Sequence, residues 1–233
     1  LTALSFFQFF VWGAWLTTLG TYGFGVKKWS GEEFGIVFMT LGIASIVMPP
    51  VIGMIADRWI NAEKLYGILH ICYGITFLFL AKTDNPTTFF WILLIAMFFY
   101  MPTISLSNSL SYTVLKNHQF DVVKAFPPIR VWGTVGFIVA MWITNIFSDE
   151  YSPLAFGVEL GNKIASFTGN ILNANQFYFA SFFAILLGIY SFTLPKCPPQ
   201  NLIPQNAKLS EKLGLNAFKL FKNYKMALFF VFS

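Results

Sequence analysis

A guanidinium, a hydroxyl and an aromatic ring occur at helical spacing in one short stretch of this sequence. Arg130, Thr134 and Phe137 occupy positions i, i+4 and i+7 of a predicted helix, which places their side chains on one face. A guanidinium offers five N–H donors, a hydroxyl donates and accepts, and a ring provides a flat apolar surface. This combination predicts a site for a small polar solute with a planar part. The alternative is that Arg130 only adds to a basic membrane surface.

Two consecutive prolines predict where that helix begins. Pro127 and Pro128 precede Arg130, and proline is tolerated at a helix start because the first N–H groups have no intrahelical acceptor. We therefore expect a membrane span over residues 131–147, with Arg130 at its amino end. A cation there opposes the helix macrodipole, so something else must hold it.

Four further residues are candidates for contact with the same solute. Gln8, Trp12 and Trp15 share one face of the first apolar segment. Because a helix rises about 1.5 Å per residue, the position of Trp12 in this segment places it near the middle of the membrane. An interfacial aromatic belt therefore does not account for it. Asn108 follows Pro102 in the fourth segment, where an amide can bind solute or link two helices. We predict that Gln8, Trp12, Trp15 and Asn108 contribute to solute binding.

A second group of charged residues follows the second apolar segment. Gly53 is followed one turn later by Asp57 and Arg58, and then by Lys64 after a short turn. The glycine permits close helix packing, and Asp57 can meet an opposite helix terminus or a cation in one conformation only. These four residues are predicted to form a conformational gate. The alternative is a solvated charge pair that ends a helix.

The remaining reactive side chains do not form a catalytic or metal-binding pattern. His70 and His118 have no partner at a useful spacing, and Cys72 and Cys197 form no C-x-x-C motif. We therefore predict no enzymatic activity, no catalytic residue, no metal and no cofactor. His70, inside the third apolar segment, is interpreted as a structural imidazole.

The amino-acid composition indicates whether these residues lie in water or in a membrane. The 233 residues are 56% hydrophobic and only 11% charged, whereas soluble domains carry about 25% charged residues. Mean hydropathy is +0.64, which excludes a soluble or disordered chain and, despite the net charge of +5, disfavours nucleic-acid binding. Crossing a bilayer takes about 20 apolar residues. Six predicted spans meet this requirement: residues 3–26, 34–56, 65–81, 88–110, 131–147 and 177–194.

The distribution of basic residues predicts the orientation of an all-α membrane protein. If the loops alternate sides, four of the 15 Lys and Arg residues lie on one side and eleven on the other, which makes the second side cytoplasmic. The amino terminus is then cytoplasmic. We expect a six-helix bundle over residues 1–194, a cytoplasmic linker over 195–225, and the start of a truncated seventh span over 226–233. The chain is accordingly interpreted as a fragment of a longer protein.

Three runs of residues carry a family resemblance. Residues 8–20, 100–103 and 126–134 resemble the bacterial nucleoside permeases of the nucleoside:proton symporter family. Residues 53–58 are similar to the signature loop of the major facilitator superfamily, which contains that family, although residues 60–63 replace its usual glycine and basic residues. Residues 148–176 exceed the family's usual connection length.

The resemblance implies the amino-terminal six-helix half of a major facilitator carrier. It implies that Arg130, Thr134 and Phe137 face a central cavity. It also implies alternating-access import of nucleosides such as uridine or adenosine across the cytoplasmic (inner) membrane, with protons as the coupling ion. The expected partners are therefore nucleosides, protons and the lipid bilayer.

Two other functions remain open at this point, and a third, an enzymatic one, is disfavoured because the sequence lacks the residue pairs that it needs. A carrier of the same fold for a sugar or another small metabolite would also use aromatic and polar side chains. A membrane-embedded enzyme would need a paired nucleophile and base. A sensor or interaction subunit would consist of this half alone.

Overall fold

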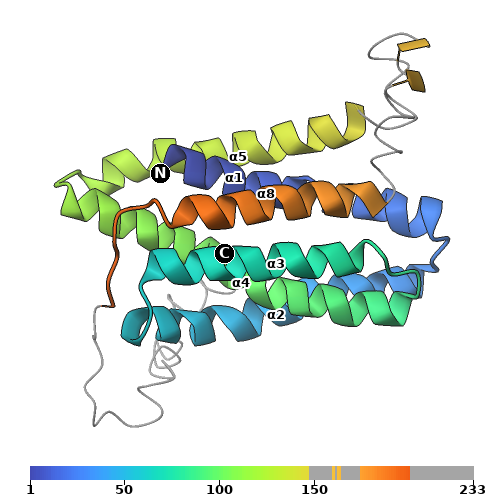
Figure 1. The fold of residues 1–233 in the computed structure, drawn as a ribbon, viewed down its shortest axis with the longest axis horizontal. Coiled ribbons are helices and arrows are strands. Elements are labelled where there is room, and N and C mark those ends of the chain that lie inside the picture. Colours follow the sequence, from blue (N-terminus) through green and yellow to red (C-terminus); the bar gives the residue numbers. More distant parts are fainter. Residues whose placement is uncertain (147–158, 161, 164–173, 200–233) are drawn as a thin grey trace, which may run out of the picture.

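The structure is a computed structural model that describes residues 1–146, 159–160, 162–163 and 174–199. All regular structure in these residues is helical, which confirms the prediction of an all-α fold. The elements are α1 (Thr2–Gly13), the π-helix η1 (Thr21–Val26), α2 (Gly31–Arg58), α3 (Ala62–Leu80), α4 (Pro86–Asn117), α5 (Val122–Ile146) and α8 (Gln176–Ser191), as Figure 1 shows. Helices α2, α3, α4 and α5 are long and apolar enough to cross a membrane, whereas α1 and α8 are shorter apolar helices.

The first predicted span is not one regular helix. Helix α1 ends at Gly13, turns follow over residues 14–18, and the chain regains helical geometry before η1. Backbone hydrogen bonds continue through this region, for example from Ala14 N to Phe10 O at 3.0 Å and from Tyr22 N to Thr18 O at 3.0 Å. The Thr18 hydroxyl donates to the carbonyl oxygen of Trp15 at 3.2 Å, which diverts a backbone acceptor from the helix ladder.

The predicted start of the fifth helix was wrong. Helix α5 begins at Val122, where the Asp121 carboxylate accepts from the backbone N–H of Val123 at 3.0 Å, and both prolines lie inside the helix. The aspartate satisfies an amide that would otherwise lack a partner, so the helix starts there rather than at the prolines. Arg130 consequently lies about 12 Å along the helix axis from its start, beyond the turn in which the macrodipole would oppose it.

Two helix pairs approach closely through glycine. The most extensive helix contacts join α1 to α5 and α3 to α8, and Figure 1 shows α8 running beside α1 and α3. A Cβ atom at Gly136 of α5 would lie 2.1 Å from the carbonyl oxygen of Phe6 in α1. A Cβ atom at Gly74 of α3 would lie 3.0 Å from the carbonyl oxygen of Ser181 in α8. Small residues therefore allow both pairs of backbones to touch.

The helices differ in how much of their apolar surface this bundle covers. In the most apolar window of α3 and of α4, 56% of the residues are buried, against 22% in α2 and in α5. Ile46 of α2 is 79% exposed and Val131 of α5 is 60% exposed. The two helices that carry the predicted gate and the predicted solute-binding residues are therefore the least covered of the four.

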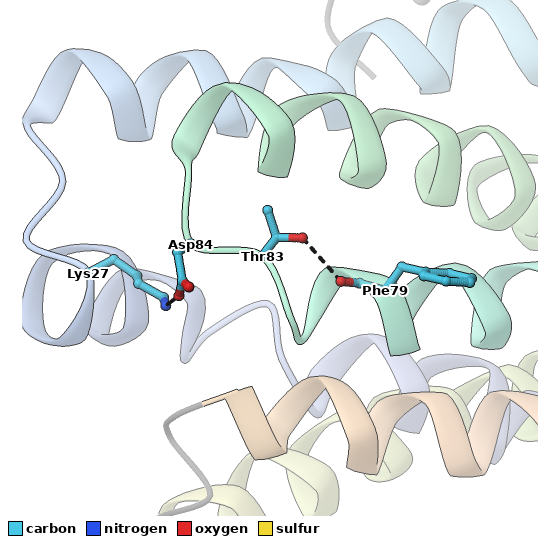
Figure 2. A network of polar contacts seen from close by, with 4 residues as sticks. All are labelled: Lys27, Phe79, Thr83 and Asp84. Carbon is cyan, nitrogen blue, oxygen red and sulfur yellow. Dashed lines mark hydrogen bonds and ion pairs between the residues drawn. The ribbon is translucent and has the colours of Figure 1, made fainter.

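One end of the bundle is joined by an ion pair. Lys27, directly after η1, pairs with Asp84 in the α3–α4 connection, as Figure 2 shows. The neighbouring Thr83 hydroxyl donates to the carbonyl oxygen of Phe79 at 3.1 Å, which continues the end of α3. Beneath the lysine, the Tyr22 ring lies edge-on to Phe177 of α8, with ring centroids 5.0 Å apart. This end therefore connects η1, α3, α4 and α8.

The opposite end joins the start of α3 to the residues after α8. The backbone N–H of Cys197 donates to the Glu63 carboxylate at 2.9 Å, and the Ala62 N–H donates to the carbonyl oxygen of Cys197 at 3.0 Å. Glu63 is only 2% exposed and also accepts from the Asn61 side chain at 3.0 Å. The first residues of the predicted linker are thus fixed to α3. Residues 200–225 of that linker and the predicted seventh span at 226–233 lie outside the described residues.

Candidate functional site

The Arg130 guanidinium lies over the Phe9 ring of α1. Its central carbon is 4.0 Å from the centroid of the Phe9 ring, well within the range of a cation–π contact. The Arg130 side chain is half-buried, and no ion pair to it forms among residues 1–146, 159–160, 162–163 and 174–199. The positive charge is therefore not neutralised by a carboxylate in the described part of the chain.

The other two residues of the predicted stripe follow Arg130 along α5. Thr134 is exposed and Phe137 is half-buried. Phe137 lies edge-on to the half-buried Trp12 of α1, with ring centroids 6.1 Å apart, and Trp12 in turn contacts Tyr100 of α4 at 6.0 Å. The structure thus brings Arg130, Phe137 and Trp12 to the α1–α5 interface, as a cation and two rings, with the exposed Thr134 hydroxyl one turn along α5 from Arg130.

Gln8 lies deeper and is the centre of a buried hydrogen-bond network. It is 0% exposed. Its amide nitrogen donates to the Thr103 hydroxyl at 3.0 Å, and its amide oxygen accepts from the Tyr66 hydroxyl at 2.5 Å. Its backbone oxygen accepts from the Tyr100 hydroxyl at 2.6 Å. One side chain of α1 is therefore bonded to α3 and α4, and its direct contact with a solute remains a prediction.

Trp15 and Asn108 occupy different environments from Trp12. Trp15 is 0% exposed, and its ring centroid lies 5.3 Å from that of Phe77 in α3. Its indole nitrogen is buried with no hydrogen-bond partner among the described residues. Asn108 is half-buried on α4. The structure does not bring either residue to Arg130, and their role in solute binding also remains a prediction.

The predicted gate lies at the carboxyl end of α2. Asp57 and Lys64 are exposed, whereas two guanidinium nitrogens of Arg58, Nε and Nη2, are buried without a partner in the described residues. Gly53 and Asp57 line a cavity of about 290 Å³ between α2 and α4, opposite Pro102 and Ser105. No ion pair links Asp57 to another side chain within the described ranges.

The titratable groups outside this interface do not assemble a metal site. Within the described residues, no three His, Cys, Asp or Glu side chains lie close enough to hold a metal ion. His70 is buried, with its Nδ1 atom 3.2 Å from the carbonyl oxygen of Tyr66. Burial and the nearby Glu63 charge raise the pKa of the Cys197 thiol to about 11. That thiol is therefore protonated and unreactive at neutral pH.

Sequence reasoning missed Phe9, the residue in contact with the Arg130 guanidinium. The only local signal is Gly133, three residues after Arg130, which indicates close approach of another chain segment. A Cβ atom at Gly133 would lie 2.6 Å from the Phe9 ring and 2.8 Å from Arg130 Nη1. The sequence cannot say which of 29 phenylalanines fills that position, because the contact joins residues far apart in the chain.

Comparison with solved structures defines the class of protein. The fold matches crystal structures of the nucleoside transporter NupG, one of them a mutant, with TM-scores of 0.80 and 0.75 and 40% sequence identity. Each match covers 99% of this chain and 52% of the NupG chain. The chain is therefore a multi-pass helical membrane protein with the fold of the amino-terminal half of a major facilitator transporter.

Sequence comparison defines the family. A family model described as "Nucleoside H+ symporter" matches residues 1–233. The chain is 43% identical over 234 residues to xanthosine permease and 40% identical over 233 residues to nucleoside permease NupG, both of Escherichia coli K12. Each alignment covers the whole of this chain but only 50% of the relative, so the chain spans about half the length of these relatives. The chain belongs to the nucleoside H+ symporter family.

Proposed function

We propose that this chain forms half of a transporter that imports nucleosides across the cytoplasmic membrane by alternating access, coupled to protons. The observation that carries the proposal is Arg130, a half-buried guanidinium without a carboxylate partner in the described residues, beside the Thr134 hydroxyl and the rings of Phe137 and Trp12. The names of the family and of the relatives, which refer to nucleosides, xanthosine and H+, support the same substrate class.

The chemistry of a nucleoside matches these four side chains. A nucleobase stacks on aromatic rings, an interaction that contributes about 1–3 kcal/mol per base in nucleic-acid proteins. The Arg130 N–H donors suit the carbonyl and ring-nitrogen acceptors of the base, and Thr134 can donate to or accept from a ribose hydroxyl. A sugar or another small metabolite is the rival substrate class, since it would use the same hydroxyl and rings but not the full guanidinium fork.

Alternating access assigns a role to the gate residues. In the proposed cycle this half rocks against the rest of the transporter, so that one site faces each side of the membrane in turn. The buried donors of Arg58 require an acceptor, and Asp57 is exposed at the end of a weakly covered helix. We propose that Gly53, Asp57, Arg58 and Lys64 form a contact made in one state only. Asp57→Asn should then change the turnover number more than the substrate affinity.

Orientation and coupling complete the proposal. The excess of basic residues on one side supports a cytoplasmic amino terminus and a cytoplasmic segment after α8. Among the described spans the only buried imidazole is His70, which hydrogen-bonds the backbone. We therefore place the acid that couples protons to transport outside this chain. An inward proton gradient should accelerate uptake, and a protonophore should abolish that acceleration.

The deciding experiment is solute uptake by vesicles that contain the full-length transporter. Radiolabelled uridine, adenosine and xanthosine are compared with a hexose. Arg130→Ala should abolish nucleoside uptake without reducing the amount of protein in the membrane. Arg130→Lys should recover little, because a point charge does not reproduce a planar fork. Hexose uptake without nucleoside uptake would overturn the substrate assignment, and normal uptake by Arg130→Ala would remove Arg130 from the site.

A further inference from the structure

We infer that Phe9, seated against Gly133, is a positioning residue that holds the Arg130 guanidinium by a cation–π contact and leaves its N–H donors free for substrate. This inference rests on the proposed function, because it assigns a role to the support of the proposed substrate-binding arginine. Phe9 itself is only 7% exposed. It therefore acts from beneath Arg130 rather than on the solute.

The first step concerns what else holds Arg130. A half-buried arginine is ordinarily oriented by a carboxylate that accepts two of its N–H groups. No such ion pair forms in the described residues. The Phe9 ring, 4.0 Å from the guanidinium carbon, takes the place of that partner. A ring quadrupole attracts the cation through the face of the guanidinium.

The second step concerns geometry. The five N–H donors of arginine lie in the guanidinium plane. A carboxylate would accept hydrogen bonds from some of them, whereas an aromatic ring has no oxygen or nitrogen acceptor to occupy them. An aromatic support thus fixes the orientation of the fork and keeps every donor available, which is the arrangement that a ligand with several acceptors requires.

The third step concerns Gly133, which makes room for the stack. Any side chain at this position would begin 2.6 Å from Phe9 Cδ2, 2.8 Å from Arg130 Nη1 and 3.1 Å from Ser5 Oγ. The first two separations are shorter than any normal Cβ contact, so even alanine would force the ring or the guanidinium to shift. Phe9, Gly133 and Arg130 therefore form one unit across the α1–α5 interface, hereafter the arginine platform.

The experiment measures equilibrium binding of uridine, adenosine and xanthosine to the purified full-length transporter. Phe9→Leu should raise the nucleoside Kd roughly tenfold, the effect of losing a partly desolvated cation–π contact. Phe9→Tyr should retain wild-type affinity, because the ring is kept. Phe10→Leu is the matched control: Phe10 neighbours Phe9 on α1, is 3% exposed and contacts Phe179 and Phe183 rather than Arg130.

A graded replacement separates electrostatics from packing. Replacing Phe9 by 4-fluoro- and then by 3,4,5-trifluorophenylalanine weakens the ring quadrupole with little change in shape, so the Kd should rise step by step while the melting temperature stays constant. Gly133→Ala should raise the Kd at least as much as Phe9→Leu.

Each possible outcome has a distinct meaning. If Phe9→Leu and the fluorinated series bind like wild type while Arg130→Ala does not bind, the arginine platform is overturned and the proposed function stands. If Phe9→Leu lowers the melting temperature and fluorination leaves the Kd unchanged, Phe9 is only a packing residue and the inference is wrong. If Arg130→Ala also binds normally, or the wild type binds no nucleoside, both the inference and the proposed function are wrong.

Discussion

The α1–α5 pair and the α3–α8 pair are built by the same packing rule but present different surfaces. In both, glycine lets one backbone touch the next. The α3–α8 contact is buried, and its polar link is the Ser181 hydroxyl donating to the Gly74 carbonyl oxygen at 2.6 Å. The α1–α5 contact instead carries Arg130 and Thr134 at its edge, on a helix with only 22% of its apolar window covered. Close packing therefore serves stability in one pair and side-chain placement in the other.

The largest expected effect is from Gly136→Ala at the α1–α5 contact. The added methyl would lie 2.1 Å from the carbonyl oxygen and 2.9 Å from the carbonyl carbon of Phe6, so backbone rather than a side chain must move. We expect nucleoside uptake to be lost. Gly42→Ala on α2, where a Cβ meets nothing within 4 Å, is the control and should transport normally. Full activity of Gly136→Ala would show that the spacing of α1 and α5 is unimportant.

Gly74→Ala makes the corresponding change in the α3–α8 pair. Its methyl would lie 2.6 Å from Cγ1 of Ile185 and 3.0 Å from the Ser181 carbonyl oxygen. Overpacking of this kind typically costs about 1–3 kcal/mol, so a thermal melt in detergent should show a lower midpoint. The KM for nucleoside should stay at the wild-type value. A raised KM without loss of stability would break the distinction between the two pairs.

Gln8→Leu tests the link between the two pairs. The substitution removes the partner of the Thr103 and Tyr66 hydroxyls, and a buried polar group left unsatisfied costs about 1–3 kcal/mol. If Gln8 serves this network alone, we expect a lower thermal midpoint with a KM change of less than about threefold. A large KM increase at unchanged stability would instead make Gln8 a substrate-binding residue, as the sequence predicted.

The smallest effect concerns Cys197, which fastens one end of the α3–α8 pair. Because its pKa is raised to about 11 from a usual value near 9.0, its thiolate population at pH 8 is about a hundredfold below that of an ordinary cysteine. In a Cys72→Ala background, maleimide labelling should be slow at pH 8 and should accelerate as the pH approaches 11. Burial is the larger cause of the raised pKa and the Glu63 charge the smaller, so Glu63→Gln should speed labelling at pH 8 modestly by removing that charge. Equal rates in both variants would contradict the Glu63 contact.

The sequence predicted the helices better than their ends and interior partners. Runs of about 20 apolar residues suffice to locate spans, because the bilayer imposes that length. The start of α5 was misplaced because the cap at Asp121 outweighs the usual proline rule. The bonds of Gln8 to α3 and α4, and the contact of Phe9 with Arg130, join segments distant in sequence. Residue type alone therefore could not separate Gln8 inside the bundle from Trp12 at its edge.

The prolines within α5 also affect how that helix deforms. Pro127 and Pro128 have no backbone N–H group. The carbonyl oxygens of Val123 and Lys124, four residues earlier, therefore lack their usual helical hydrogen-bond donors. Two consecutive intrahelical hydrogen bonds are thus missing just before Arg130. The first turn of α5 can consequently bend relative to the rest of the helix, and its amide protons should exchange with solvent faster. The part of α5 that packs against α1 keeps its position while this turn moves.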